Sequence, residues 1–437
     1  MNISGFRNSK LFTCRTHLLI RSFSTPTKLS GCLPVMEEYS KWTKEQLIQR
    51  IEQLENKPKQ SPTSTTTNTQ HPAKRKKEMD FSKYSTRKIA IRFGYLGWNY
   101  NGLAVQQQEG IETVESQILK ALYKTKLIRS MDVSECDFSR CGRTDKGVSA
   151  FRQVISLQVR SKLTVEEQSD PSKDNEELDY LRMINNSIPN DIVLYEICLR
   201  PPADFDARFS CEYRHYHYYF HSANLDIAAM ADAAKRFIGE HDFRNFCKID
   251  ASKQITNFKR RVLISEIVKH PQVENMYYFS LRGTAFLWHQ VRSMIAVILL
   301  VGQGLESPTM ISDLVDTAKY PSRPVYDMAA DYPLVLYDCG FPPMEWISFN
   351  KGDPLNTIKH NTFNLWHDYW MKQAIVAGFQ QVVDANANTT DTGDQRERIY
   401  INTGGGYGKG HSKYHVLSSR QRLDTPDVIN ARYSSKR

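Results

Sequence analysis

Apolar and polar positions follow regular periods along most of the chain between residues 87 and 345. Ile89, Ile91, Phe93 and Tyr95 fall on every second position, which is the period of a strand with one buried face. The same two-residue period predicts strands at 153–160, 191–199, 213–221, 262–269 and 276–282. Apolar positions at helical spacing predict helices around 114–122, 178–184, 225–238 and 285–301. Strands and helices thus come in two successive units of similar make-up. We therefore expect an internal structural duplication, although no sequence repeat is detectable.

The regions outside this pattern divide by composition. Residues 1–35 contain no acid and five basic residues among many Ser and Thr, which is typical of a transit segment and equally of a disordered tail. Helical spacing predicts a short amphipathic helix at 36–56. A basic linker follows at 57–86, and its cluster Lys74–Lys77 could be a nuclear import signal, an RNA-binding arm or a solvated linker.

The organisation expected from these boundaries has two central subdomains, 87–200 and 201–345. A C-terminal extension at 346–437 would contain one amphipathic helix, Leu365–Val382, then a loose stretch and a basic end. The predicted localisation is the cytoplasm and nucleus. Only product begun at Met1 would form a mitochondrial pool, because translation from Met36 would omit the acid-free segment.

Composition excludes two classes of protein. The 437 residues are 40% hydrophobic and 11% aromatic, which is too apolar for a wholly disordered chain. The longest apolar stretch, around Met294–Gly302, is far shorter than the roughly 20 residues that cross a bilayer, so we expect no membrane protein. Residues 1–88 hold 17 Lys and Arg against 7 Asp and Glu, whereas the remainder holds 41 of each. Nucleic-acid binding by the folded part would therefore need local patches of positive charge on its surface.

Cysteine, histidine and glycine spacing argues against bound metals and nucleotides. The eight cysteines form no C-x-x-C pair, which argues against a disulfide framework and a cysteine zinc site and for a reducing compartment. His215 and His217 share a strand face but have no third ligand at a suitable spacing, so a metal site there is disfavoured. The glycine cluster Gly404–Gly410 fits no dinucleotide or P-loop motif.

Three stretches could carry chemistry. The first, Cys141–Gly147, places Asp145 between Arg143 and Lys146 in a glycine-bounded turn. On composition alone the Asp-x-Gly pattern favours a plain turn, but the flanking cations also favour an ionised carboxylate that can act as nucleophile or base.

The second stretch is Phe205–Ser210 with the strand Tyr213–His221, which interleaves Arg214 with Tyr216 and other aromatics on one face. Such a face suits base stacking and phosphate contact, although it could equally be an ordinary sheet face. The third stretch, Phe286–Arg292, opens an apolar helix. Its Arg292 should pair with a carboxylate, because a buried arginine is costly without a partner.

Together these stretches resemble the TruA family of tRNA pseudouridine synthases over about residues 87–345. The segment CGRTDKGV is similar to the family's G-R-T-D-x-G-V, FDARFS to F-x-A-R-F-S, and FLWHQVR to F-L-x-H-x-V-R. Three further segments, at 88–106, 239–250 and 333–341, resemble the branch that modifies positions 38 and 39 of the tRNA anticodon stem-loop.

The resemblance implies an isomerase that converts uridine to pseudouridine without a cofactor or metal. It implies that Asp145, Tyr216 and Arg292 are catalytic, with Arg292 paired to Asp145 and Tyr216 stacked on the base. Arg143, Arg208, Arg214 and His289, together with Tyr216, become candidates for tRNA binding. Arg143 would fill the space of the flipped nucleotide.

The implied fold is α+β, with two RRM-like α/β subdomains whose antiparallel sheets join around a central catalytic cleft. Relatives are homodimers, so a homodimer is expected, without a membrane or nucleotide partner. The alternatives are a noncatalytic RNA-binding protein of the same fold and a multisite tRNA pseudouridine synthase.

Overall fold

The computed structural model describes residues 43–44, 79–106, 108, 110–348, 353–386 and 398–435. The predicted transit segment, the amphipathic helix apart from Thr43 and Lys44, most of the basic linker and the loose stretch after the long helix lie outside the described residues. The chain divides into two units, Met1–Lys76 and Lys77–Arg437.

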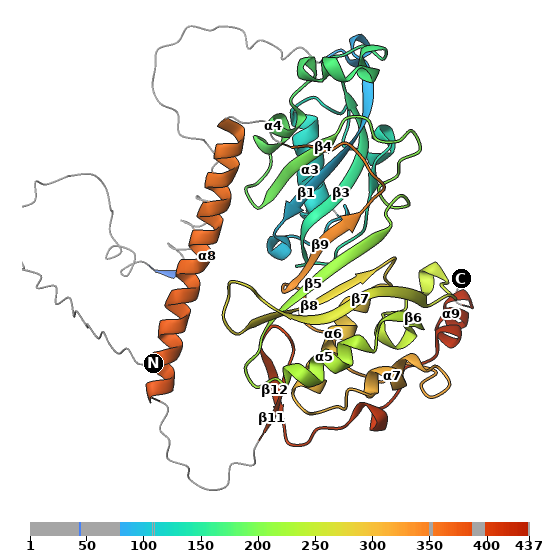
Figure 1. Cartoon of the computed structure of the whole chain (residues 1–437), viewed down its shortest axis with the longest axis vertical. Helices are drawn as coiled ribbons and strands as arrows, with labels where there is room; N and C mark the ends of the chain where they lie inside the picture. The colour runs from blue at the N-terminus through green and yellow to red at the C-terminus, as the bar shows by residue number, and fades with distance from the viewer. Residues whose placement is uncertain are drawn as a thin grey trace, which may run out of the picture. The chain divides into compact units, whose positions relative to one another are not determined.

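One sheet of ten strands runs through the second unit (Figure 1). Its strand order is β10-β4-β1-β3-β9-β5-β8-β7-β6, and β2 pairs with β3 off this path. All described neighbours in it pair antiparallel except β3 and β9, which pair parallel through Ser149 with Val335 and Ala150 with Leu336. The strands are β1 Thr86–Tyr95, β2 Ser139–Arg140, β3 Ser149–Arg160, β4 Ile192–Cys198, β5 Tyr213–His221, β6 Gly239–Asp242, β7 Lys259–Lys269, β8 Met276–Gly283, β9 Leu334–Gly340 and β10 Ile347–Ser348.

The two halves of the sheet repeat one topology. The N-terminal half is built as β1-α3-β2-β3-α4-β4, with strands in the order β4-β1-β3-β2. The C-terminal half is built as β5-α5-β7-β8-α6-β9, with strands in the order β9-β5-β8-β7 and β6 added at the edge. Both follow the β-α-β-β-α-β pattern with the fourth strand beside the first. The α+β fold with two RRM-like halves is therefore confirmed, and so is the duplication that the periodicity predicted.

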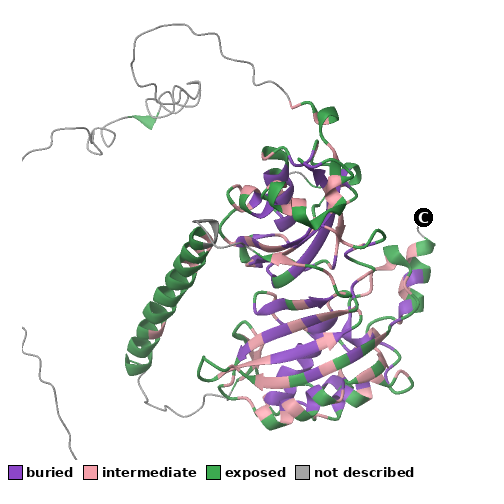
Figure 2. Ribbon diagram, turned by 45° about the horizontal axis from the view of Figure 1, so that its top comes forward, coloured by how far each residue is buried: buried purple, intermediate pink, exposed green. Residues whose placement is uncertain are grey.

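Each half has its own apolar core beneath the sheet. The helices that cover it are α3 Val114–Lys124 and α4 Tyr180–Asn185 in the first half, and α5 Ile227–Lys235, α6 Gln290–Gly302 and α7 Met310–Val315 in the second (Figure 2). The most thoroughly buried helix is α6, which explains its nearly continuous apolar sequence. Tyr216 of β5 packs against both cores, so it marks the line where the halves join.

Two differences from the predicted elements lie where the halves of the sheet join. The helix expected from residue 285 begins only at Gln290, because His289 has a φ of 61° and the residues before it form a turn. The periodicity predicts no strand at 333–341, yet Leu334–Gly340 forms β9, which joins the two halves.

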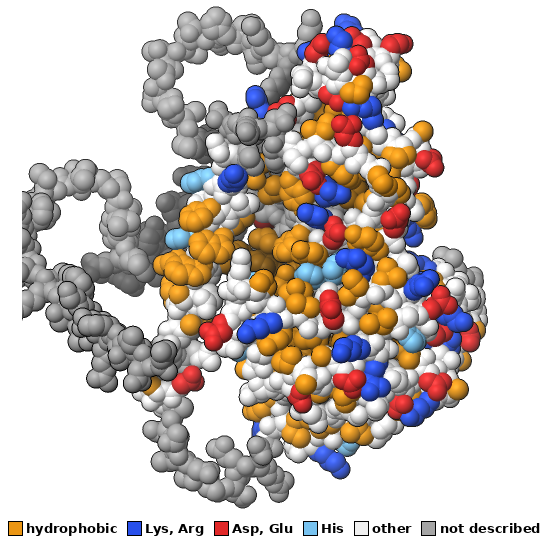
Figure 3. Space-filling view, in the orientation of Figure 1, with side chains coloured by type: hydrophobic (Ala, Val, Ile, Leu, Met, Phe, Trp, Pro, Cys, Tyr) orange, Lys and Arg blue, Asp and Glu red, His pale blue; other side chains and the backbone are white. Residues whose placement is uncertain are grey.

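The described C-terminal region contains a long helix and a tail. Helix α8, Asp353–Asn386, contains the predicted helix Leu365–Val382 and is longer. The predicted amphipathic character is not observed, because nearly all of its described side chains are exposed, the apolar ones included. Hydrophobic side chains, Trp366, Trp370 and Phe379 among them, lie on its surface (Figure 3). The tail forms the hairpin β11 Ile399–Asn402 and β12 Tyr407–His411, then α9 Pro426–Ser434. No described helix is long and apolar enough to span a bilayer.

Candidate active site at the junction of the two halves

The Asp145 loop connects β2 to β3 and is held by the N-terminal half. The backbone carbonyl of Thr144 accepts from the Leu103 N–H at 3.3 Å, and the Thr144 hydroxyl is hydrogen bonded to the Tyr95 hydroxyl at 2.8 Å. The Val148 N–H donates to the Asp145 carbonyl at 3.2 Å, which closes the turn. This loop is therefore fixed by backbone bonds, and the Asp145 side chain remains 29% exposed.

Gly147 is required by this turn. Its φ of 79° lies in the left-handed region that favours glycine. A Cβ at this position would lie 2.9 Å from the carboxyl carbon of Asp331. The glycine thus lets the loop approach Asp331, a residue that the sequence analysis did not single out.

Arg292 lies between two carboxylates. Its Nη1 is 3.9 Å from Oδ2 of Asp145, and its Nη2 is 3.9 Å from Oδ2 of Asp331. Its Nε donates to the carbonyl of Ala329 at 2.9 Å, and the Ala329 N–H donates back to the Arg292 carbonyl at 3.2 Å. The guanidinium is thus anchored at one end while its two arms face the carboxylates. The predicted pairing of Arg292 with a carboxylate is observed.

The imidazole of His289 also contacts the Asp145 carboxylate. Its Nε2 lies 3.4 Å from Oδ2 of the carboxylate. Burial lowers the pKa of His289 below its ordinary value, and the nearby Asp145 only partly offsets this effect. The imidazole is therefore neutral at pH 7, so the positive charge beside Asp145 comes from Arg292.

Tyr216 approaches the same junction from β5. Its ring packs edge to face against Phe286, with centroids 5.3 Å apart, so one side of the ring is already supported. Burial raises the pKa of the Tyr216 hydroxyl well above its usual range, and Asp145 adds to the increase. The hydroxyl therefore stays protonated at neutral pH.

Arg214 holds three segments together. Its guanidinium donates to the backbone carbonyls of Cys141 and Arg208, both at 2.8 Å, and to that of Thr284 at 3.0 Å. Arg214 thus links the Asp145 loop to the Phe205–Ser210 loop and to the end of β8. Direct contact of Arg214 with substrate stays a prediction.

Exposed cations and aromatics surround this junction. Arg143 is exposed on the Asp145 loop. Arg208 is exposed beside Phe209, whose side chain is 80% accessible. Exposed Trp288 lies under the ammonium groups of Lys248 and Lys253, at 4.8 and 5.8 Å from its ring centroid. Pairs of this kind suit stacking on bases and contact with phosphates.

Four features of the site were not predicted from the sequence: Asp331, Phe209, Phe286 and the pair of Trp288 with Lys248. Phe209 and Phe286 stand inside the quoted motifs, so their aromatic character could have marked them. Asp331 stands in no such pattern, and only the tertiary fold brings it to Gly147 and Arg292.

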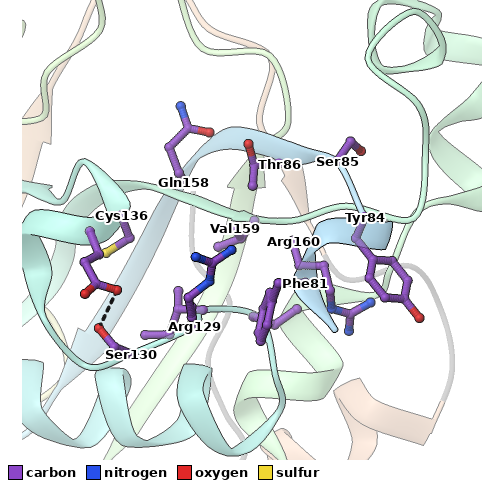
Figure 4. Close-up of a pocket in the computed structure, with 13 residues that line it drawn as sticks. Phe81, Tyr84, Ser85, Thr86, Arg129, Ser130, Cys136, Gln158, Val159 and Arg160 are labelled. Carbon is purple, nitrogen blue, oxygen red and sulfur yellow. Dashed lines mark hydrogen bonds between the residues drawn. The ribbon is translucent and has the colours of Figure 1, made fainter. Parts of the chain in front are cut away.

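The two described cavities lie away from Asp145, Tyr216 and Arg292. The larger, of about 410 Å³, is lined by Phe81, Tyr84, Arg129 and Arg160 among others, at the far end of β1 and β3 (Figure 4). The smaller, of about 140 Å³, lies between Arg244–Ile249 and the C-terminal tail. The central catalytic cleft therefore stays a prediction.

Three cysteines meet beside the Asp145 loop. The sulfur atoms of Cys141, Cys211 and Cys339 all lie within 4.8 Å of one another, and all described cysteines are free thiols. The absence of a C-x-x-C pair excludes only a metal site built from neighbouring cysteines, so a metal site formed by these three distant cysteines remains compatible with the sequence.

Comparisons with known proteins identify the family. A family model described as tRNA pseudouridine synthase matches residues 233–342. The chain is 49% identical over 416 residues to the tRNA pseudouridine(38/39) synthase of Saccharomyces cerevisiae, covering 91% of this chain and 92% of that protein. It is 37% identical over 358 residues to the human protein of the same name, covering 78% and 73%. It is also 32% identical over 259 residues to tRNA pseudouridine synthase A of Methanothrix thermoacetophila, covering 59% and 85%. With identity of this extent over nearly all of a relative, the chain belongs to the TruA family of tRNA pseudouridine synthases, which are isomerases that act on tRNA.

Proposed function

We propose that this chain converts uridine to pseudouridine at positions 38 and 39 of the tRNA anticodon stem-loop, with Asp145 as its nucleophile or base and without a cofactor. The target positions rest on the printed names of the yeast and human relatives. The observation that supports the chemistry best is the approach of Asp145 to Arg292 and His289 where the two halves of the sheet join.

The reaction is an isomerisation, so atoms and electrons balance within one nucleotide. The N1–C1′ bond breaks, the uracil turns over, C5 bonds to C1′, and the proton lost from C5 is matched by one gained at N1. Asp145 would either attack C1′ or remove the 2′ proton. No redox step and no group transfer occur, so the chemistry requires no electron carrier.

Neighbouring side chains would assist this step. Arg292, anchored on Ala329, would orient the Asp145 carboxylate and stabilise its charge. Tyr216 would stack on the uracil. Because burial keeps its hydroxyl protonated, a role in relaying the C5 proton fits better than a role as a direct base.

Position mapping tests the proposal. The purified full chain is incubated with tRNA transcripts that carry uridine at 38 and 39, or cytidine at one of these positions. Carbodiimide treatment and primer extension then locate pseudouridine. We expect primer extension to stop at the sites that report pseudouridine at positions 38 and 39. Each stop should be lost in the transcript that carries cytidine at that position. Stops at other uridines would favour a multisite enzyme, and tight binding without stops would favour a noncatalytic RNA-binding protein.

Replacing Tyr216 with Phe should retain tRNA affinity and lower the rate of pseudouridine formation by about 100-fold or more, as expected for loss of a proton-transfer group. The ring would still pack against Phe286, so stacking persists. Single-turnover rates and binding constants measure the two effects separately. Tyr219→Phe is the matched control, because Tyr219 lies in the same strand and packs against Tyr278 and His270 instead. A normal rate in Tyr216→Phe would mean that Tyr216 serves only as a stacking platform.

Deleting residues 1–78 should weaken tRNA binding about tenfold or more at low salt and little at high salt. The deleted segment holds 14 Lys and Arg against 6 Asp and Glu, and the deletion keeps Asp80, whose side chain caps the short helix Phe81–Lys83. Binding constants measured across salt concentrations should show a smaller slope for the truncated chain. The matched control replaces only Lys74–Lys77 with Gln. A change in the modified positions would show that the arm belongs to the recognition surface.

A further inference from the structure

Three cysteines from distant parts of the sequence form one buried cluster beside the active site. Cys141 is the first residue of the Asp145 loop, Cys211 precedes β5, and Cys339 lies in β9. Their exposed fractions are 1%, 8% and 2%. The sulfur atoms of Cys141 and Cys211 are 3.3 Å apart, and all three lie within 4.8 Å of one another.

These separations match a shared metal ion. Zinc–sulfur bonds of about 2.3 Å place two sulfur ligands of one tetrahedral ion roughly 3.8 Å apart. Sulfur atoms within 4.8 Å of one another can reach that arrangement by small side-chain rotations. Buried cysteines that served only as small apolar residues would not need to bring all three sulfur atoms together.

The surrounding charge also fits a divalent cation. Three thiolates around an M²⁺ ion leave one negative charge. The Arg214 guanidinium lies directly beside the cluster, since it donates to the carbonyl of Cys141 at 2.8 Å and to that of Cys211 at 3.4 Å. Its positive charge would balance the remaining negative charge. Arg214 would then lie in the outer sphere of the ion, where it fixes the backbone of two ligands.

We propose that Cys141, Cys211 and Cys339 bind one thiophilic divalent cation, of which Zn²⁺ is the biological example. Each cysteine would bind as a thiolate, and the displaced thiol protons would pass to solvent. Soft sulfur ligands select zinc over the hard cations Mg²⁺ and Ca²⁺. The cation would tie the Asp145 loop of the first half to β5 and β9 of the second. The three thiolates would fill three positions of a tetrahedral ion and leave the fourth to a water molecule, and no step of the proposed isomerisation passes through the ion.

Metal uptake by the full chain tests this proposal. The reduced, metal-free protein is titrated with Zn²⁺ against a chromophoric chelator, and with Cd²⁺ while the ultraviolet thiolate-to-metal absorption is followed. Cys14 and Cys32 are replaced with Ser throughout, because they lie outside the described residues. We expect one ion per chain, a Kd below about 1 µM and a raised melting temperature. Cys211→Ser and Cys339→Ser should lose the thiolate absorption and the tight binding.

The matched control is Cys247→Ser. Cys247 is also buried, but its sulfur contacts the carbonyl of Arg244 in the C-terminal half. This variant should bind the ion as the parent does. Circular dichroism of each metal-free variant confirms folding before titration. If the folded parent takes up no Cd²⁺, or if Cys339→Ser binds as tightly as the parent, the proposal is wrong. The parent titration alone can overturn it, even if a cysteine variant fails to fold.

Discussion

Asp145→Asn should bind tRNA normally and form pseudouridine more than about 10⁴-fold more slowly, the scale of loss seen when a nucleophile is removed. The amide keeps the shape of the carboxylate, so the loop bonds of Thr144 and Val148 should persist. It can neither attack C1′ nor accept the 2′ proton. Affinity should stay equal or rise slightly, because one negative charge facing a polyanion is lost. Single-turnover mapping and binding constants give the two quantities.

Two comparisons make this result specific. Asp145→Ala is needed because deamidation of the Asn variant would regenerate some Asp145 and give residual activity. The Ala variant cannot deamidate, and we expect it to be as inactive as Asp145→Asn. Asp331→Asn removes the other carboxylate that faces Arg292 at 3.9 Å, so it changes the same arginine without removing the proposed nucleophile. We expect a loss of about tenfold for Asp331→Asn, the scale of a single partly exposed charge contact. An Asp331 variant that is slower than the Asp145 variant would overturn the assignment of Asp145.

The sequence predicted the elements whose pattern is local. The two-residue period of β1 and β5 and the apolar run of α6 identified strands and helices, because each buries one face or nearly its whole surface. It did not predict the start of α6, since the left-handed conformation of His289 depends on the turn before it. It also overlooked β9, whose consecutive apolar residues are buried because the strand lies between the two halves.

The candidate site divides in the same way. Asp145 and Gly147 are two residues apart in sequence, so their turn could be predicted directly from the residue types. Tertiary contacts across both halves bring Asp331 to Arg292 and bring Cys141, Cys211 and Cys339 together. Spacing rules such as C-x-x-C detect only residues that are close in sequence, so they could not predict these contacts. Arg214 shows a further limit. Its alternation with aromatics indicated an RNA-binding face, whereas its guanidinium donates to four backbone carbonyls inside the protein.

Arg292→Gln should lower the single-turnover rate by about 10²–10³-fold with little change in tRNA affinity, the range found when a preorganised charged or hydrogen-bonding group is removed from an active site. In the native chain the guanidinium separates Asp145 from Asp331 and stabilises both carboxylates. Gln cannot supply that charge, so the two carboxylates would face each other uncompensated. Melting temperatures should accompany the rates, because Arg292 also joins α6 to Ala329.

Arg292→Lys separates charge from geometry. Lysine keeps one positive charge, but its single ammonium cannot both donate to Ala329 and face two carboxylates, as the branched guanidinium does. We therefore expect a rate between those of the Gln variant and the native chain. Added guanidinium ion should partly restore Arg292→Ala and leave Asp145→Ala inactive, because the small cation can replace the missing charge but not the missing nucleophile. Full activity in Arg292→Lys would show that charge alone suffices. Full activity in Arg292→Gln would remove Arg292 from the proposed mechanism and leave His289, whose pKa is lowered by burial, as the other side chain that contacts the Asp145 carboxylate.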